Sequence, residues 1–384
     1  MKICFISASV GTISASQETV IYQMAKNLNK KHDVTLITGR SRIKHLLKPI
    51  ETAPFEIVTV PFWPRNTPLN DFFSQFFGRL FGRLNKWKVE SLSFYISVML
   101  RPNVKRKIKE ADVIVSYYRT DNRLFSNLAY RYRVPTVSNL QFVSVGKGFF
   151  DIDKSIIYIT NSKYSKYSFE RKYGVKIDGV VTPGISLEFF NEDVPTIPDI
   201  RRQKTLLFVG FLRREKGIFE LIEIFNKIYE KHKDIMLVIV GVDGEKEALI
   251  DRLRSLKLSD RVIFVGEIDY EDMPSYYRSA TLLIHPTYRE TFGMVVLEAM
   301  ASGLPVIASD IPALREVTGG RAILLPLNNL NLWIEKIDYL LKNEKNRKEI
   351  SMKGIEKAKE ELWEKKAEQL EQYLIKAAKY KGKL

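Results

Sequence analysis

The residues best suited to do chemistry lie in the run Glu290–Val306, which reads ETFGMVVLEAMASGLPV. A strand is predicted to end near His285, and a helix is predicted to begin near Met294. The first amides of such a helix lack intrahelical acceptors, so they favour an anion such as phosphate. Glu298 lies a turn further in, where a carboxylate can accept hydrogen bonds from two neighbouring hydroxyls, as in ribose. The run therefore predicts a site for an anion joined to a sugar diol.

The elements that must position this run are short apolar strands separated by helical patterns. Strands are predicted at 2–9, 33–38, 56–60 and 112–116, and later at 205–209, 236–240, 262–265, 281–284, 305–308 and 322–325. Residues 17–28 carry apolar side chains at helical spacing. Such alternation indicates an α/β protein with parallel sheets, whose ligands bind beyond the carboxyl ends of the strands.

Proline and glycine residues mark the boundary between the predicted domains. We predict an N-terminal domain over 1–184, a linker over 185–202 and a C-terminal domain over 203–360. Residues 361–384 belong to a helical tail, whose pattern runs from Lys353 to Lys379 with Trp363 on its apolar side.

The Glu290–Val306 block resembles the family 4 retaining glycosyltransferases (glycosyl transferases group 1). Members have the GT-B fold, in which two Rossmann-like domains with parallel sheets face each other across a cleft. Supporting motifs are VGFLRREKG at 209–217, VGVDG at 240–244, VIFVG at 262–266 and TPGI at 182–185. Trp363 is expected where the family's terminal helix crosses back to the first domain.

The resemblance implies a role for each matching position. Glu290 would bind the donor sugar, Glu298 the ribose, and Lys216 with Arg213 the leaving phosphate. Further donor-binding positions are Gly210, Arg214, Gly241, Gly266, Phe292, Gly293, Met294 and Val295. The implied donor is a UDP- or GDP-linked sugar, with no other cofactor and no metal.

Three departures from the family pattern matter. Phe211 stands where an arginine is usual, so Arg213 or Arg214 must supply the second cation, and we favour Arg213. Residues 15 and 16 are alanine and serine where glycines are usual, which leaves Gly11 as the acceptor-side glycine. Tyr117 follows the 112–116 strand where many members have histidine, so it is the candidate to hydrogen-bond the acceptor.

The net charge of +16 lies wholly in the first half of the chain. Residues 1–184 hold 29 basic and 13 acidic side chains, and the remaining residues hold 32 of each. The same half carries an aromatic and basic stripe at helical spacing: Phe72, Phe73, Phe76, Phe77, Arg79, Phe81 and Arg83. This stripe is typical of a helix lying on an anionic membrane, and equally of a core or partner-facing helix. The basic cluster 101–109 either adds to it or is a solvated face.

Other features carry weaker chemistry. Asp151 and Asp153 form an aspartate pair of the kind that holds a divalent ion, but a surface loop explains it better. The four histidines are scattered, and the single Cys4 fits a core strand. No run reaches the roughly 18 apolar residues of a membrane span, so we expect a cytoplasmic, peripheral protein.

The sequence leaves several functions open. The first is a hexosyltransferase acting on a membrane lipid or lipid-linked glycan. The second is a soluble enzyme with a small phosphorylated or polysaccharide acceptor. A non-catalytic GT-B protein that binds a membrane or polyanion is a third. A nucleic-acid binder is disfavoured, because no recognised nucleic-acid motif accompanies the charge.

Overall fold

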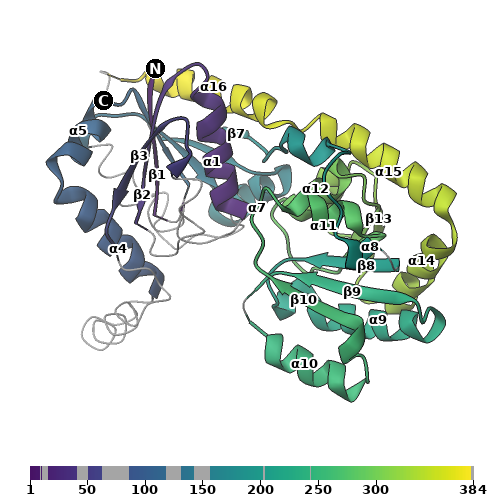
Figure 1. The fold of residues 1–384 in the computed structure, drawn as a ribbon. Helices are drawn as coiled ribbons and strands as arrows, with labels where there is room; N and C mark the ends of the chain where they lie inside the picture. Colours follow the sequence, from purple (N-terminus) through teal and green to yellow (C-terminus); the bar gives the residue numbers. More distant parts are fainter. Residues whose placement is uncertain are drawn as a thin grey trace. The chain divides into compact units, whose positions relative to one another are not determined.

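The computed structural model describes residues 1–8, 10, 16–40, 51–62, 86–117, 131–141, 156–201, 204–242 and 244–381. They form two compact units: residues 1–182 with 363–384 make unit 1, and residues 183–362 make unit 2. Each unit contains one parallel sheet flanked by helices (Figure 1). The predicted α/β class with two parallel-sheet domains is confirmed.

Unit 1 has a seven-stranded sheet in the order β3-β2-β1-β4-β5-β6-β7. Its elements are β1 (Lys2–Ser7), α1 (Ser16–Leu28), β2 (Asp33–Gly39), β3 (Glu56–Val60), α4 (Lys86–Met99), α5 (Pro102–Glu110), β4 (Val113–Ser116), β5 (Thr136–Leu140), β6 (Ile157–Thr160), α7 (Lys163–Tyr173), β7 (Gly179–Val180) and α16 (Trp363–Ala378). The central β1 is apolar almost throughout because helices cover both faces of a parallel sheet. Helix α16 packs beside α1 (Figure 1).

One face of the unit 1 sheet packs against α4 and α5. Cys4 and Ile6 of β1 join Phe94 of α4 and Ile108 of α5 in one buried apolar cluster. Burial raises the pKa of the Cys4 thiol to about 12. The prediction that Cys4 is a core residue is confirmed, since a thiol of this kind is almost wholly un-ionised at neutral pH.

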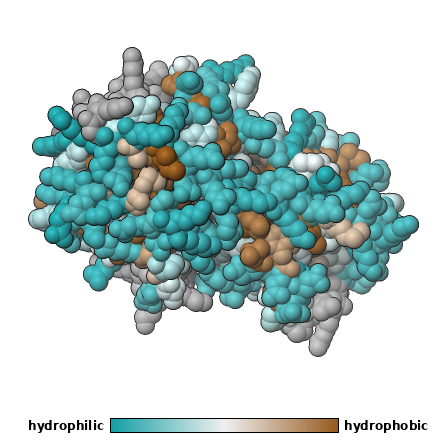
Figure 2. All heavy atoms as spheres, turned by 90° about the horizontal axis from the view of Figure 1, so that it is seen from above, coloured by the Kyte–Doolittle hydropathy of each residue, from teal (hydrophilic) through white to brown (hydrophobic). Residues whose placement is uncertain are grey.

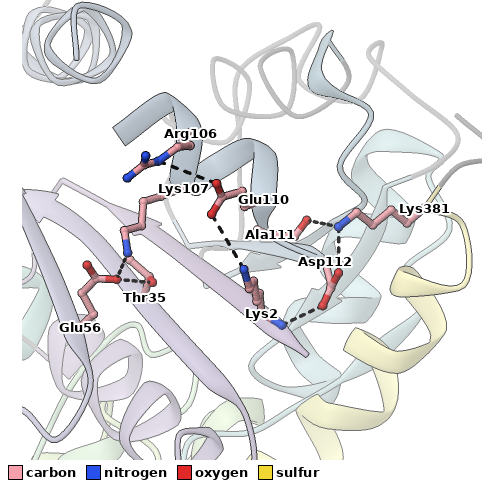
Figure 3. A network of polar contacts seen from close by, with 9 residues as sticks. All are labelled: Lys2, Thr35, Glu56, Arg106, Lys107, Glu110, Ala111, Asp112 and Lys381. Carbon is pink, nitrogen blue, oxygen red and sulfur yellow. Dashed lines mark hydrogen bonds and ion pairs between the residues drawn. The ribbon is translucent and has the colours of Figure 1, made fainter. Parts of the chain in front are cut away.

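Polar contacts attach α5 to strands β3 and β1 of the same sheet (Figure 3). Lys107 Nζ lies 2.5 Å from Glu56 Oε2 of β3, and Lys2 pairs with Glu110 at 3.9 Å. Lys381, beyond α16, lies 2.8 Å from Asp112 Oδ1. Part of the basic cluster 101–109 therefore serves to attach α5 to the sheet.

Unit 2 has a six-stranded parallel sheet in the order β10-β9-β8-β11-β12-β13. Its elements are η2 (Leu187–Phe190), α8 (Pro198–Arg201), β8 (Lys204–Val209), η3 (Arg214–Lys216), α9 (Ile218–Lys231), β9 (Ile235–Val240), α10 (Lys246–Ser255), η4 (Ser259–Arg261), β10 (Val262–Gly266), α11 (Met273–Ser279), β11 (Leu282–His285), α12 (Met294–Ala301), β12 (Val306–Ser309), α13 (Pro312–Thr318), β13 (Ile323–Leu325), α14 (Leu330–Lys342) and α15 (Glu344–Lys359). The strand order reverses between β8 and β11, and ligands bind at such a switch point in open α/β sheets.

The structure differs from the sequence prediction in two connecting segments. The predicted linker 185–202 packs onto unit 2, where Phe189 is buried and the Ile197 amide donates to Ser279 Oγ at 2.7 Å. The helical pattern predicted from Lys353 to Lys379 forms two helices, α15 and α16, which are separated at residues 360–362. The chain passes there from unit 2 to unit 1, close to the predicted start of the terminal segment at residue 361.

Strands β5, β6 and β7 were not predicted. Two of them lack an apolar run, since β5 reads TVSNL and β7 has two residues, whereas the apolar β6, which reads IYIT, was overlooked. They are held by pairing with their neighbours, as in Ile114 opposite Thr136 and Ile159 opposite Gly179.

Several predictions concern residues outside the described ranges. These are Gly11, the aspartate pair at 151 and 153, and the stripe of Phe72, Phe73, Phe76, Phe77, Arg79, Phe81 and Arg83. Among the helices that the structure describes, none is both long and apolar enough to cross a bilayer. Hydrophilic side chains dominate the face in Figure 2, with apolar ones in small groups.

Candidate active site

Two loops meet at the switch point of unit 2. The first follows β8 and spans 210–217, and the second follows β11 and spans 286–293. The Tyr288 amide donates to the Glu215 carbonyl at 2.9 Å, which ties one loop to the other. Gly217 has φ +67°, and a Cβ there would lie 1.7 Å from the Pro286 carbonyl oxygen. Only glycine permits this approach, which places the end of the first loop against the start of the second.

Glu290 is the centre of the charged groups in these loops. Its Oε1 forms an ion pair with Lys216 Nζ, and it also lies 3.2 Å from His285 Nε2. The three side chains are 15%, 19% and 2% exposed, respectively. Oε2 of Glu290 has no hydrogen-bond partner among the described residues, so it is available to a ligand.

The electrostatics keep Glu290 ionised. Burial raises the pKa of this carboxyl, but the charge of Lys216 and the hydrogen bond from His285 lower it further, to about 2. A buried carboxylate this strongly held is negative at every physiological pH. It is therefore suited to accept hydrogen bonds from sugar hydroxyls.

The helix that follows Glu290 begins as the sequence predicted. Gly293 has φ +105°, and a Cβ there would lie 2.5 Å from Leu314 Cδ2. The amides of Val296 and Leu297 donate to the Gly293 carbonyl. Four preceding amides have no backbone acceptor among the described residues: those of Phe292, Gly293, Met294 and Val295. Helix α12 thus presents amides to an anion beside Glu290.

Glu298 lies on α12, and its pKa is shifted in the opposite direction from that of Glu290. Burial raises the pKa of this carboxyl to about 7, although a hydrogen bond from Tyr277 lowers it. The phenol donates to Glu298 Oε2 at 2.7 Å. The pKa values of two glutamates eight residues apart are therefore shifted in opposite directions, because one faces a lysine and the other a tyrosine.

The glycine turns that follow β8, β9 and β10 interlock. The Gly210 amide donates to the Val240 carbonyl at 3.0 Å, and the Gly241 amide donates to the Gly266 carbonyl at 2.7 Å. A Cβ on Gly241 would lie 1.9 Å from the Gly210 carbonyl oxygen. The three glycines thus form a backbone surface without side chains at the same sheet edge.

The arginines near Lys216 extend outwards. The Arg213 guanidinium lies 4.9 Å from the centre of the Phe211 ring. Arg214 stacks on Phe219 at 4.5 Å and pairs with Glu245 at 3.4 Å. Both arginines are exposed. Phe211, at the departure from the family pattern, therefore supports an arginine.

The structure places Tyr117 differently from its predicted acceptor-side role. The side chain is 1% exposed and stacks on Phe5 of β1, with ring centroids 6.1 Å apart. Burial raises the pKa of its phenol above the usual range. The residue directly follows β4, and its ring packs against a side chain of the neighbouring strand β1.

Two partners of the predicted glutamates were missed from the sequence. His285 was noted only as a strand end, and Tyr277 was not singled out. Both contact their glutamate across a gap in sequence, of 5 and 21 residues. For His285 the available signal was a polar residue at the end of an otherwise apolar strand. The helix of Tyr277, which reads MPSYYRS, offers no such signal. Among the described residues, no three His, Cys, Asp or Glu side chains form a metal-binding group.

Comparison with known proteins identifies the family that unit 2 resembles. Residues 191–357 match the family described as glycosyl transferases group 1. D-inositol 3-phosphate glycosyltransferase of Corynebacterium diphtheriae is 27% identical, over 57% of this chain and 56% of that protein. The O-antigen chain mannosyltransferase B of Escherichia coli is 24% identical, over 56% and 58%. The chain thus matches a little over half the length of these relatives.

Solved structures resemble both units in fold. HepE of Anabaena, solved in complex with UDP and glucose, has a TM-score of 0.76 and 18% identity, covering 97% of this chain and 99% of that one. Sucrose-phosphate synthase of Thermosynechococcus elongatus has a TM-score of 0.74 and 20% identity, covering 98% of each chain. The chain has the GT-B fold, and its residues 191–357 match the family model of the group 1 glycosyltransferases.

Proposed function

We propose that this protein is a retaining glycosyltransferase that moves a hexose from a UDP- or GDP-sugar to a hydroxyl of a membrane-associated lipid or lipid-linked glycan. One observation carries the donor part: Lys216 and Glu290 form a partly buried pair just before the open amides of α12. A cation and a helix N-terminus fit a diphosphate, and a buried carboxylate fits sugar hydroxyls. The group 1 family match over residues 191–357 supports the same reaction class.

The reaction proceeds on one face of the sugar. The acceptor oxygen bonds to the anomeric carbon on the side from which the diphosphate departs. The bond from that carbon to the phosphate oxygen breaks, and the acceptor proton passes to the departing phosphate. Lys216, Arg213 and the α12 amides neutralise the charge that develops there, without a metal ion. Glu290 holds the sugar, and Glu298 holds the ribose.

A thermal-shift screen with UDP-, GDP- and ADP-sugars tests donor binding. One nucleotide class should raise the melting temperature, because a ligand that binds only the folded state stabilises it. The shift should persist in EDTA, since the chain's own groups hold the diphosphate. Shifts with none of the three would favour the non-catalytic GT-B protein.

The surface of unit 1 supports a membrane-associated acceptor. Leu92, Ile96 and Leu100 are 43%, 47% and 74% exposed. Their spacing of four places Leu92 and Ile96 on one side of α4, and Leu100 directly follows the end of that helix. Helix α5 follows at once with exposed Arg106 and Lys109. Exposed apolar side chains next to bases match the requirements of an anionic bilayer surface.

Vesicle sedimentation tests this acceptor. The protein should pellet with phosphatidylglycerol vesicles more than with phosphatidylcholine vesicles. Replacing all three apolar residues by serine should weaken binding to the vesicles by about a hundredfold, because burial of each side chain contributes roughly 1 kcal/mol. Leu187→Ser, at an exposed site of unit 2, is the control. Equal pelleting of the triple variant would favour a soluble acceptor and leave donor chemistry intact.

A further inference from the structure

His285 makes a contact that packing alone does not explain. The ring is 2% exposed and stacks on Phe208, with centroids 6.3 Å apart. Its Nδ1 is buried and has no hydrogen-bond partner among the described residues. A leucine of similar size would fill this space without an unsatisfied polar atom, which is costly. The other nitrogen, Nε2, is the one that reaches Glu290.

Lys216 and His285 both bind the same atom of Glu290, its Oε1. In the proposed reaction, which this inference rests on, Lys216 must also serve the diphosphate. An ammonium drawn towards a doubly charged leaving group interacts less with Glu290. A buried carboxylate that loses its cation is strongly disfavoured, and it either takes up a proton or moves.

We propose that His285 is a positioning residue that holds Glu290 ionised and oriented while Lys216 engages the diphosphate. Its Nε2–H donates to Oε1 throughout the reaction, which leaves Oε2 for the sugar hydroxyl. The backbone of β11 fixes the ring, since His285 pairs with Ala308 of β12. His285 touches neither donor nor acceptor and acts only through Glu290.

The test measures kcat at saturating donor across pH 5–9, because kcat reports ionisation in the enzyme–substrate complex. Wild type should be flat on the acid side. His285→Leu should lose about 10- to 100-fold in kcat, the range for a hydrogen bond to a charged group, and its acid limb should move towards neutrality. His285→Gln, whose amide nitrogen can replace Nε2, should recover most of the rate, and the shorter His285→Asn should not.

His232→Leu is the matched control. His232 Nε2 donates to Asp338 Oδ1 at 2.7 Å and is also buried, but it directly follows the C-terminus of α9. It should lower the melting temperature and leave the kcat profile unchanged. A wild-type profile in His285→Leu, or equal rates for the glutamine and asparagine variants, overturns the positioning role. A wild-type protein that turns over no nucleotide sugar overturns instead the function on which it rests.

Discussion

At the scale of single residues, the site separates two glutamates by their surroundings. Glu290 faces Lys216 and His285, so its pKa falls to about 2. Its contribution to stability is present above the unfolded pKa of about 4.5 and is lost as pH falls towards 2. The pKa of Glu298 is raised to about 7. The protonated carboxyl therefore stabilises the folded protein below pH 4.5, and this contribution is lost as the pH rises from 4.5 through 7.

Glu298→Gln should therefore stabilise the protein and impair its binding. At pH 8 the wild type keeps a buried carboxylate ionised at a cost of about 2–3 kcal/mol. The variant should melt several degrees higher at pH 8, and the difference should disappear near pH 4. Its affinity for the nucleotide sugar should fall about tenfold, because a charged acceptor of the ribose hydroxyls is lost.

The wild type should also bind donor more weakly below pH 7. Ribose hydroxyls donate to the ionised form of Glu298, so binding favours loss of the proton. Calorimetric titration at pH 6 and pH 8 measures this, with Glu335→Gln, which removes an exposed acid of α14, as control. A donor affinity that is equal at both pH values would contradict a direct contact with Glu298.

At the scale of elements, the site depends on two loops that approach within atomic contact. Gly217→Ala should displace the first loop, since its Cβ would lie 1.7 Å from the Pro286 carbonyl oxygen. We expect at least a tenfold loss of donor affinity, because Lys216 precedes this glycine. Gly174→Ala is the control: φ is +63° there, but nothing lies within 4 Å of the new Cβ.

Both glycine variants carry the same backbone strain, of order 1 kcal/mol. Only the first carries the steric clash. Equal donor affinity in Gly217→Ala and Gly174→Ala, measured by the same titration, would show that the loop contact does not position the site.

The strand–turn–helix run that holds both glutamates could be predicted from sequence because all its signals are local. An apolar strand ends, a glycine closes the turn, and an apolar helix follows within 17 residues. The partners of the glutamates could not be predicted in this way. Tyr277 reaches Glu298 from α11, and Lys216 reaches Glu290 from the loop after β8, so both contacts exist only once the sheet is assembled.

At the scale of the whole molecule, the chain returns to its first unit at the end. Trp363 is 1% exposed at the start of α16, and Leu370 and Leu374 are fully buried. Glu371 lies 2.7 Å from His32, and Lys376 lies 3.8 Å from Asp178. The terminal helix is thus part of the unit 1 core, as the position of Trp363 in the sequence suggested.

Leu370→Ala should lower the free energy of unfolding of unit 1 by about 2–5 kcal/mol, as expected for a buried leucine. Limited proteolysis should then cut residues of unit 1 faster, while donor binding by unit 2 is retained. Ile375→Ala on the same helix is the control, since that side chain is 43% exposed. Loss of donor binding in Leu370→Ala alone would contradict a donor site built within unit 2.

Part of the net charge of +16 is accounted for by ion pairs within unit 1. The described structure commits Lys107 to Glu56, Lys381 to Asp112 and Lys31 to Glu368, so part of the excess fastens unit 1 together. The donor site that we propose in unit 2 needs few cations. Among the other bases of unit 1, Arg106 and Lys109 are those that we propose to face the membrane.

The most direct test of the central claim is turnover of the nucleotide sugar that the screen identifies. Glu290→Ala should abolish release of the nucleoside diphosphate, and Lys216→Ala should reduce kcat by about 10²–10³-fold, the range for removing a group that stabilises developing charge. Lys227→Ala, which breaks an exposed lysine–glutamate pair on α9, should keep the wild-type rate. Wild-type turnover in Glu290→Ala would contradict the assignment of this site.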